Sequence, residues 1–470
     1  MQLMTDLGVA LETLTASQAD LEVLTDGDAP VACAHDWWMR GLIERRQGKE
    51  RRAGAVLRPA STEQVAAVLA WAQETRTAVV PYGLGSGVCG AVAAERDQVV
   101  LDMGKMSSLL DVNDLSLTAT VQPGMRGSDY ENALNERGYT MGHFPQSIEL
   151  STVGGWCATR AAGQLSTLYG NIEDMLLGCE VVLAGGRIIR LPAMPRSSTG
   201  PDLRQLFLGS EGTLGVFTEL VFRVHARAEA TWSRCFAMPS LAAGIAALRL
   251  TLRAGWRPAV TRLYDATEAG RNFQVASEGQ PVLLLMSEGP RGRIDAESLA
   301  VGQIVAAQGG VDKGSEPVET WLENRNHVPS FEDLLDSGLV VDTIEIAIGW
   351  ERVEPLWDRV VLEGSAVPGM LAMSGHVSHS YTQGANIYFT FVAQQSALDE
   401  ALYLYDAVWE LTMKATHEMG GTIAHHHGIG RVRKKWLSRE LDTAHCLLSS
   451  IKNTLDPLGI MNPGALIDSP

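Results

Sequence analysis

The spacing of apolar residues in the first half of the chain predicts short strands that alternate with helices. Val65 and Leu69 recur at helical spacing after Ser61, which forms a capping box with Gln64. Strands are predicted at 78–80, 99–103, 116–122, 179–184, 187–191 and 216–224, and a further helix over 128–137. Gly185-Gly186 predicts a hairpin, because both positions tolerate positive φ. The alternation indicates an α/β unit.

Beyond residue 226 the chain has fewer glycines, and its pattern is that of strands and amphipathic helices, with helices predicted over 398–418 and 438–455. The run 374–391 predicts a hairpin that turns at Gln383-Gly384, and a two-residue turn would place His379 opposite Tyr388. Tyr388 would lie on the polar face of its strand. Both a proton-exchanging tyrosine and a buried tyrosine satisfied by hydrogen bonds fit this pattern.

The segment from Val80 to Ala91 carries glycines at 83, 85, 87 and 90. It matches G-x-G-x-x-G, but the seven residues between Gly90 and Gln98 leave no room for the helix that a Rossmann fold requires. No Lys-Ser/Thr pair follows, which excludes a P-loop. We therefore expect a strand, a glycine loop and a second strand that bind a diphosphate through backbone amides, with a simple surface turn as the alternative.

Composition narrows the function. A chain of 470 residues is long enough for two domains, and a net charge of −17 with a pI near 5.1 argues against nucleic acid as a partner. The six cysteines form no C-x-x-C pair, which favours reduced thiols in the cytoplasm. The sequence shows no apolar run of membrane-spanning length and no leader pattern. Any anionic substrate must meet locally placed cations.

Three consecutive histidines, His425-His426-His427, stand before Gly428-Ile429-Gly430. Side chains alternate along an extended segment, so these rings cannot all face one way. Chelation by His425 and His427 stays open, but a role as acid, base or anion partner is favoured, and no metal is predicted.

Glycine-rich segments at four separated points, each next to a predicted strand, suggest one extended ligand. They fall within 81–87, 151–155, 159–163, 169–174 and 209–215. In combination they resemble the FAD-binding domain of the vanillyl-alcohol oxidase / p-cresol methylhydroxylase (PCMH) superfamily. The resemblance implies FAD, held without a covalent bond because 81–90 contains no histidine. It places at the FAD the residues Pro81, Tyr82, Gly83, Leu84, Gly85, Ser86, Gly87, Pro145, Ser147, Ser151, Gly154, Gly155, Thr159, Arg160, Ala162, Glu211, Gly212, Thr213, Gly215 and Val216.

The second half is similar to the alkyldihydroxyacetonephosphate synthase (alkylglycerone-phosphate synthase) family, through the Arg325 segment, the Tyr388 strand and the histidine run. This resemblance implies that Tyr388 is the acid/base, that Arg262 is essential, and that His425 to His427 form the active-site cluster. Arg325 is expected to contact the substrate, and we expect the same of His379.

In that family a fatty alcohol replaces the acyl group of an acyl-dihydroxyacetone phosphate, through an adduct at flavin N5 and without net redox change, in ether lipid biosynthesis. The alternative is an FAD-dependent oxidase or dehydrogenase of a small 2-hydroxy acid or alcohol. Such relatives carry an acidic H-x-G-D-G-N segment, whereas this chain has His376-Val377-Ser378-His379. A flavin-binding protein without turnover is the third alternative.

The expected architecture is α+β: a two-subdomain FAD-binding domain of the PCMH type and an α/β cap domain with an antiparallel sheet. We divide the chain into an N-terminal helical segment (1–52), the FAD-binding domain (53–225), the cap or substrate domain (226–415) and a C-terminal segment that returns to the active site (416–470). A small or lipid-like substrate is expected in the cytoplasm. Peripheral contact with a membrane and a homodimer stay open.

Overall fold

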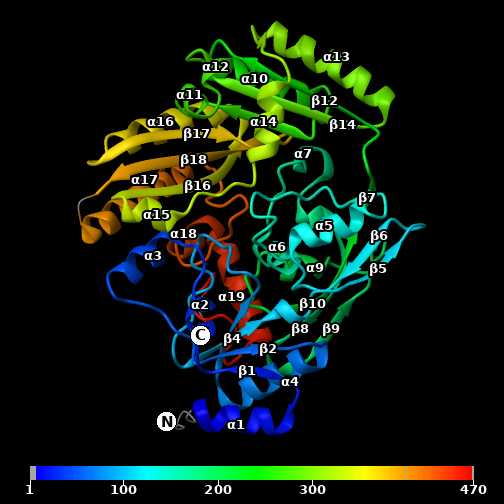
Figure 1. Cartoon of the computed structure of the whole chain (residues 1–470), viewed down its shortest axis with the longest axis vertical. Coiled ribbons are helices and arrows are strands. Elements are labelled where there is room, and N and C mark those ends of the chain that lie inside the picture. The colour runs from blue at the N-terminus through cyan, green and yellow to red at the C-terminus, as the bar shows by residue number, and fades with distance from the viewer. Residues whose placement is uncertain (1–6, 396, 468–470) are drawn as a thin grey trace.

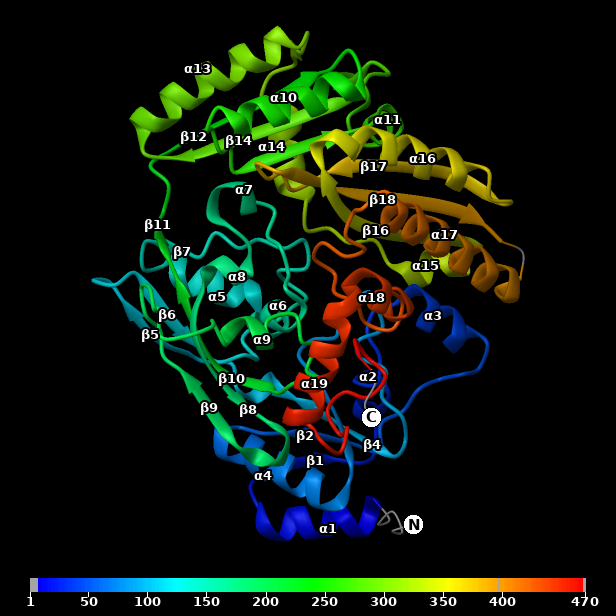
Figure 2. The same ribbon diagram turned by 180° about the vertical axis from the view of Figure 1, so that it is seen from behind.

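The computed structural model describes residues 7–395 and 397–467, so the outermost ends of the segments 1–52 and 416–470 lie outside the described residues. The described strands form sheets of four, five and seven strands and one two-stranded ribbon. The two smaller sheets make up the lower part of the molecule in Figure 1, and the seven-stranded sheet forms the upper part. The C-terminal segment, drawn in red, starts at the junction of the two parts and runs down alongside the lower part (Figures 1 and 2).

The four-stranded sheet has the order β1 (Glu22–Leu24), β2 (Ala55–Arg58), β4 (Gln98–Asp102) and β3 (Ala78–Tyr82). β3 and β4 are parallel neighbours, although the connection over residues 83–97 contains no helix. The predicted strand, glycine loop and strand without a crossover helix is therefore confirmed.

Two helices cover this sheet: α1 (Leu7–Ser17) and α4 (Thr62–Thr75). The predicted cap of α4 is present, because Ser61 Oγ accepts the backbone N–H of Gln64 at 3.3 Å. Val65 and Leu69 are fully buried, as their spacing predicts. The local signals therefore predict this helix correctly.

The five-stranded sheet is antiparallel, with the order β5 (Leu109–Asn113), β6 (Thr118–Val121), β10 (Val216–Arg223), β8 (Leu176–Val182) and β9 (Ile188–Leu191). The predicted hairpin at Gly185-Gly186 is confirmed, since Val182 pairs with Ile188 and both glycines have positive φ. The helices of this region are α5 (Gly127–Asn135), α6 (Val153–Thr159), α7 (Ser166–Tyr169), α8 (Ile172–Met175) and α9 (Arg204–Phe207). The ribbon β7 (Tyr139–Thr140) and β11 (His225–Ala226) leads toward the upper part.

The upper part, the cap, is built on an antiparallel sheet. Its strands, in spatial order, are β15 (Val311–Asp312), β12 (Ala230–Ala237), β14 (Val282–Gly289), β13 (Val260–Tyr264), β17 (Met370–Val377), β18 (Gly384–Gln394) and β16 (Leu339–Gly349). Its helices are α10 (Leu241–Arg253), α11 (Ala266–Asn272), α12 (Gln274–Ser277), α13 (Arg291–Ala307), α14 (Glu316–Asn324), α15 (Phe331–Asp336), α16 (Val353–Ser365) and α17 (Leu398–Glu418). The predicted helix over 398–418 is thus confirmed.

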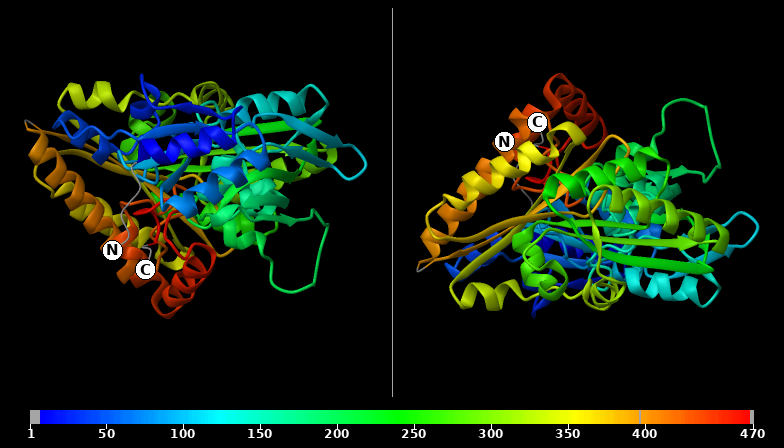
Figure 3. Two further views of the ribbon diagram at one scale, coloured as in Figure 1. Left: turned by 90° about the horizontal axis from the view of Figure 1, so that it is seen from below. Right: turned by 90° about the horizontal axis from the view of Figure 1, so that it is seen from above.

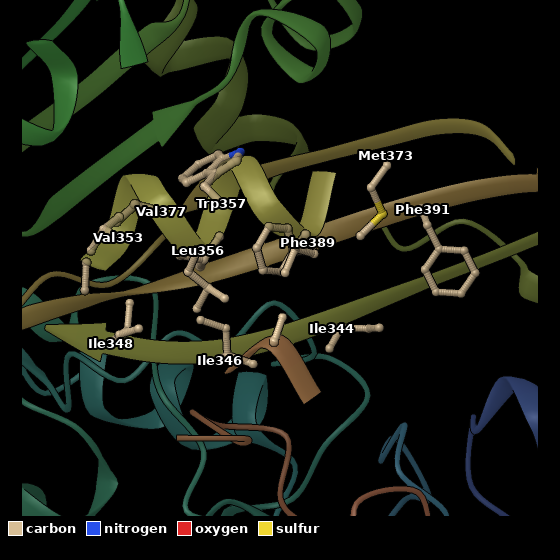
Figure 4. Packing of buried hydrophobic residues seen from close by; sticks show 14 of the residues in the cluster. Ile344, Ile346, Ile348, Val353, Leu356, Trp357, Met373, Val377, Phe389 and Phe391 are labelled. Carbon is tan, nitrogen blue, oxygen red and sulfur yellow. The ribbon is translucent and has the colours of Figure 1, made fainter. Parts of the chain in front are cut away.

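Alternation along the cap strands divides the interior into two cores. Phe389 and Phe391 of β18 join Trp357 of α16 in the outer core, which Figure 4 shows from close by. Helices cover this outer face when the molecule is seen from above (Figure 3). On β14, Leu283 packs in the same outer core, whereas its neighbour Leu284 belongs to the core shared with the five-stranded sheet. One face of the cap sheet is therefore turned to the FAD-binding part.

The hairpin that carries Tyr388 differs from the prediction. Tyr388 pairs with His376, and not with His379. The turn is longer than predicted, because Ser380 pairs with Ala385 and encloses residues 381–384. In addition, the side-chain Oδ1 of Asn386 accepts the backbone N–H groups of both Ser378 and His379 at 2.9 Å. This interaction draws residues 378–379 out of the regular ladder, so the register of a simple two-residue turn does not apply.

The C-terminal segment forms two helices, α18 (Lys434–Leu441) and α19 (His445–Leu455), instead of the predicted single helix over 438–455. Asp442, at φ 45°, makes the corner between them. The segment then returns to the first sheet, where Asn462 N donates to Val79 O and its side-chain Nδ2 donates to Ala91 O and Glu211 O. Among the described residues, no helix has both the length and the apolar character needed to cross a membrane.

The remaining short elements link these layers. They are the helices α2 (Ala29–Ala32) and α3 (Met39–Arg46) and the 3-10 turns η1 (Met103–Lys105), η2 (Ala184–Gly186), η3 (Trp350–Arg352) and η4 (Asp442–Ala444). α3 contacts the cap helix α17 through an ion pair of Arg40 with Asp406.

Candidate active site

A cavity of about 940 Å³ opens between the FAD-binding part and the cap. The glycine loop after β3 lines one side, and Tyr388, Arg262 and Arg325 of the cap line the other. Residues more than 300 positions apart in the sequence therefore share one site. A volume of this order accommodates a large organic cofactor together with part of a substrate.

The residues expected at the FAD line this cavity, with two exceptions. Arg160 points outward: its side chain is 45% exposed and its guanidinium approaches Gln205 and Glu173. The Thr213 side chain is turned into the protein, where its Oγ1 donates to Ser210 O at 2.7 Å. For these two positions the expected contact with the cofactor is not supported by the geometry.

The cavity floor fits a flavin dinucleotide. A Cβ atom at Gly83 would lie 2.5 Å from Thr152 Oγ1, and one at Gly87 would lie 3.2 Å from Asp36 Oδ2. The loop backbone can approach these neighbours so closely only because both residues are glycines. Gln164 Oε1 is buried at the cavity wall and has no hydrogen-bond partner among the described residues. A polar ligand would satisfy this orphaned acceptor.

Tyr388 lies on the face of β18 that is turned to the cavity, between two imidazoles. Its ring stacks on His376 with centroids 4.9 Å apart and on His426 at 5.9 Å. Burial raises the pKa of Tyr388 well above its ordinary value. The phenol is therefore neutral near pH 7 and can donate a proton, whereas acting as a base would first require deprotonation.

His376 links Tyr388 to Arg262. Arg262 Nη2 lies 2.7 Å from His376 Nε2, and His376 Nδ1 lies 2.9 Å from Glu268 Oε1. Because a guanidinium can only donate, Nε2 must accept, and Nδ1–H donates to Glu268. Burial lowers the pKa of His376, although Glu268 opposes the shift. Arg262 also donates through Nε to Tyr264 Oη at 2.8 Å, so its position is fixed from two sides.

Arg325 lies at the end of α14 and lines the same cavity. Its guanidinium lies against the rings of Phe144 (5.4 Å) and Trp321 (5.8 Å), and its Nε has no hydrogen-bond partner among the described residues. Burial lowers its pKa, but arginine stays protonated at neutral pH. A half-buried cation with aromatic neighbours requires an anionic partner.

The backbone of the histidine run is held by one carboxylate that sequence analysis missed, Glu345 of β16. The N–H groups of His425, His426 and His427 donate to Glu345 Oε1 at 3.2, 3.1 and 2.8 Å. Arg433, which is fully buried, donates through Nη2 to Oε2. Burial alone would raise the pKa of Glu345, but Arg433 and the nearby histidines hold it well below its ordinary value.

The three rings of the run face different ways. His426 and His427 line the cavity, whereas His425 does not and instead places Nε2 2.6 Å from Tyr381 Oη. His427 Nδ1 lies 3.1 Å from Glu345 Oε2, a close contact that does not have hydrogen-bond geometry. Burial lowers the pKa of His425 to about 4.

His379, expected to contact the substrate, is buried and lines the cavity beside His425 and His426. Ring nitrogens of these three histidines lie within 4.8 Å of one another. However, His425 Nδ1 and His426 Nδ1 already form a 2.8 Å hydrogen bond, and His379 Nε2 lies 3.1 Å from Gly163 O. These bonds account for the close approach of the rings, and no carboxylate of the described residues belongs to the group, so we assign no metal ligands here.

Glu211 of the FAD-binding part holds the end of the same run. Its carboxylate accepts the N–H groups of Ile429 and Gly430, the latter at 2.9 Å, and it lines the cavity. Burial raises the pKa of Glu211 to about 7. Residues 425–430 are therefore bound by two carboxylates, Glu345 of the cap and Glu211 of the FAD-binding part.

The residues missed by sequence analysis are Glu345, Arg433, His376 and Glu268. Glu345 leaves one signal, because it interrupts a strand whose alternate positions are Ile344, Ile346 and Ile348. An acid at the polar position of an otherwise apolar strand indicates a buried partner. Nothing in the local sequence of Arg433 distinguishes it from the exposed cations around it.

Known proteins share this arrangement. A family model described as FAD binding domain matches residues 53–192, and one described as FAD linked oxidases, C-terminal domain, matches residues 228–466. An uncharacterized FAD-linked oxidoreductase of Escherichia coli (strain K12), YgcU, is 34% identical over 429 residues, 88% of each chain. Alkyldihydroxyacetonephosphate synthase of Dictyostelium discoideum is 31% identical over 466 residues, 91% of this chain and 76% of that protein.

A solved structure of an alkyldihydroxyacetonephosphate synthase superposes with a TM-score of 0.82 at 28% identity, covering 98% of this chain and 86% of that one. The expected FAD-binding part with an antiparallel cap is thus confirmed, and so is FAD as the cofactor. The chain therefore belongs to the family of FAD-linked oxidases, whose members include alkyldihydroxyacetonephosphate synthases, and it is an FAD-dependent enzyme.

Proposed function

We propose that this enzyme exchanges the acyl group of an acyl-dihydroxyacetone phosphate for a fatty alcohol, as an alkylglycerone-phosphate synthase does. The observation that carries the proposal is the convergence of an unpaired cation, Arg325, and a neutral phenol, Tyr388, on the cavity that fits FAD. The bound flavin would supply the electron-rich centre at which the substrate carbon exchanges its substituent. The chain's own residues would bind the phosphate and move protons.

Arg325 would hold the phosphate group. Its Nε has no acceptor among the residues that the structure describes, and its guanidinium lies among aromatic rings, so a phosphate oxygen would be its main counterion. Arg262 lies across the same Trp321 ring, 5.1 Å from its centroid, and adds positive charge to the same region. The acidic chain thus concentrates two cations where an anionic headgroup would bind.

Tyr388 would supply the proton that the leaving carboxylate takes, and it would recover a proton from the incoming alcohol. Its raised pKa keeps the phenol protonated before the reaction. One of the two cavity-lining histidines beside it, His426 or His427, would accept or return the proton.

The cavity continues along an apolar wall formed by Val341 of β16 and Val392 of β18. Val328, Phe331 and Trp37 complete it on the other side. A surface of this kind favours an alkyl or acyl chain over a small polar substrate.

Exchange of a radiolabelled fatty alcohol into acyl-dihydroxyacetone phosphate, without loss of flavin absorbance, tests the proposal. We expect labelled ether product and released fatty acid from the FAD-loaded enzyme. Absence of product with a fully flavin-loaded preparation would refute alkyl transfer.

The second candidate is oxidation of a small 2-hydroxy acid or alcohol, favoured by the FAD-linked oxidase model that spans residues 228–466. The neutral His426 would then act as a base toward the substrate hydroxyl. Anaerobic bleaching of the flavin by a hydroxy acid would support this alternative and would distinguish it from alkyl transfer. A homodimer, peripheral membrane contact, a cytoplasmic location and non-covalent FAD remain predictions.

A further inference from the structure

We propose that Glu345 is the residue that positions the histidine run, and that it makes His427 the histidine presented to the reaction beside Tyr388. The starting observation is geometric: Glu345 and Tyr388 are directly paired across β16 and β18. Cross-strand partners share one face of a sheet, so the carboxylate and the phenol both face the FAD-binding part.

Five groups surround the Glu345 carboxylate. Oε1 accepts from three consecutive backbone N–H groups, those of His425, His426 and His427, and Oε2 accepts from Arg433 Nη2. The Nδ1 edge of His427 lies 3.1 Å from Oε2, without hydrogen-bond geometry. An ionised carboxylate only accepts, and its two oxygens offer about four lone-pair positions. The site is therefore nearly saturated, and its fully buried charge is compensated by Arg433.

This geometry gives the three histidines different roles. His425 turns away from the cavity toward Tyr381, and His426 lies stacked on Tyr388. His427 directs Nδ1 to Glu345, which leaves Nε2 on the opposite edge of the ring, in a side chain that lines the cavity with its centroid 5.6 Å from that of Tyr388. The partner of one imidazole nitrogen determines what the other nitrogen can do.

Glutamine cannot replace Glu345, although its shape is the same. Its single side-chain oxygen can accept either from the backbone N–H groups of residues 425–427 or from Arg433. Its NH₂ group, which can only donate, must then face the donors on the other side. The variant Glu345→Gln should therefore release residues 425–427 while it leaves the glycine-rich FAD cradle of residues 81–87 unchanged.

Asp342 offers a matched control. It lies on β16 three positions before Glu345, on the opposite face of the sheet, and is equally buried, with Trp409 Nε1 donating to its Oδ2 at 3.0 Å. Asp342→Asn removes a buried charge from the same strand without touching the histidine run.

The first measurement needs no substrate. Hydrogen exchange of the FAD-loaded protein, followed by mass spectrometry on peptides that cover residues 425–430, should be about tenfold faster in Glu345→Gln and unchanged in Asp342→Asn. Unchanged exchange in Glu345→Gln would overturn the proposal. If Glu345→Gln fails to retain FAD, Glu345→Asp replaces it in the experiment. The shorter side chain keeps the negative charge near Arg433 but moves its oxygens away from the backbone N–H groups of residues 425–427. The same faster exchange is expected.

The second measurement rests on the proposed function. Glu345→Gln should lower kcat about 100-fold with little change in KM, because the reacting side chain is displaced while the substrate contacts remain. If Glu345 acts through His427, the double variant with His427→Ala should be no slower than His427→Ala alone. Effects that multiply would overturn the proposal. A wild-type enzyme without alkyl transfer would refute the proposed function only, since hydrogen exchange decides the positioning role independently.

Discussion

His376 faces Tyr388 across two antiparallel strands, and their rings stack at 4.9 Å with planes inclined by 27°. The two nitrogens of His376 are already engaged, one by Arg262 and the other by Glu268. The ring therefore supports the phenol but has no free proton to exchange with it. Tyr388 thus carries the movable proton of this stack.

Replacement of Tyr388 by phenylalanine should leave the protein yellow but lower turnover by about 10² to 10⁴, the range that a lost general acid produces. The ring and its stacking on His376 remain, so FAD content and thermal stability should change little. Absorbance at the flavin band and steady-state turnover check both parts.

Tyr405→Phe is the matched control, because Tyr405 is also buried but belongs to the outer core, where its hydroxyl accepts from Trp38 Nε1 at 3.0 Å. Its turnover should equal that of the wild type. Near wild-type activity of Tyr388→Phe would exclude the phenol as the acid.

Arg325→Met should weaken anion binding. Methionine keeps an apolar stem against Phe144 and Trp321 but removes the cation, so affinity for inorganic phosphate and for a phosphorylated substrate should fall about tenfold or more. Calorimetric titration with inorganic phosphate and the value of KM measure this. Arg359→Met on α16, whose partners Glu363 and Glu418 lie on the surface, should leave both unchanged.

The glycine loop should tolerate no side chain at Gly85. Its φ is +67°, and an added Cβ would lie 2.8 Å from Tyr82 Oη. Gly85→Ala should therefore reduce FAD affinity about tenfold, since left-handed backbone costs an alanine on the order of 1–2 kcal/mol. Gly270→Ala, in α11 with open space around the added atom, is the control and should bind FAD normally. Equal FAD content in the two variants would contradict the expectation.

Glu211 should make stability depend on pH. Its pKa rises from an ordinary 4.5 to about 7 in the folded protein, so the folded state holds the proton more tightly than the unfolded chain. The stabilisation is complete below pH 4.5 and is lost as pH rises to about 7, by an amount on the order of 3 kcal/mol.

Glu211→Gln keeps an oxygen for the N–H groups of Ile429 and Gly430 and should remove this slope. Denaturant unfolding of the FAD-loaded protein at pH 5, 6, 7 and 8 compares the two. Glu63→Gln, at the exposed start of α4, should reproduce the wild-type pH dependence, and identical slopes in Glu211→Gln would contradict the assignment.

Local signals in the sequence predicted the elements and the cofactor cradle. The cap of α4 at Ser61, the Gly185-Gly186 hairpin and the glycine loop after β3 each depend on neighbouring residues, and the structure contains all three. Two predictions were wrong: the strand register at Tyr388 and the single final helix. The register at Tyr388 is changed by a longer turn and by the Asn386 side chain, and the final helix is divided at Asp442.

The candidate site divides in the same way. Tyr388, Arg262 and Arg325 were identified through resemblance, and the structure places all three at one cavity. Glu345 could not be assigned a role from sequence, because its importance arises from donors that lie 80 or more residues away. Arg160 was expected at the FAD, but its side chain is 45% exposed and its guanidinium approaches Gln205 and Glu173, two contacts that the local sequence does not indicate.

The contact of the C-terminal segment with β3 has a consequence for the order of assembly. Met461 pairs with Val79, and Asn462 donates to Ala91 O and Glu211 O on either side of the flavin cradle. On the ribosome, the glycine loop is synthesised some 370 residues before the partners that fasten it. The nascent chain thus exposes an unfastened cradle throughout translation, and the enzyme can secure its flavin only after synthesis of this segment is finished.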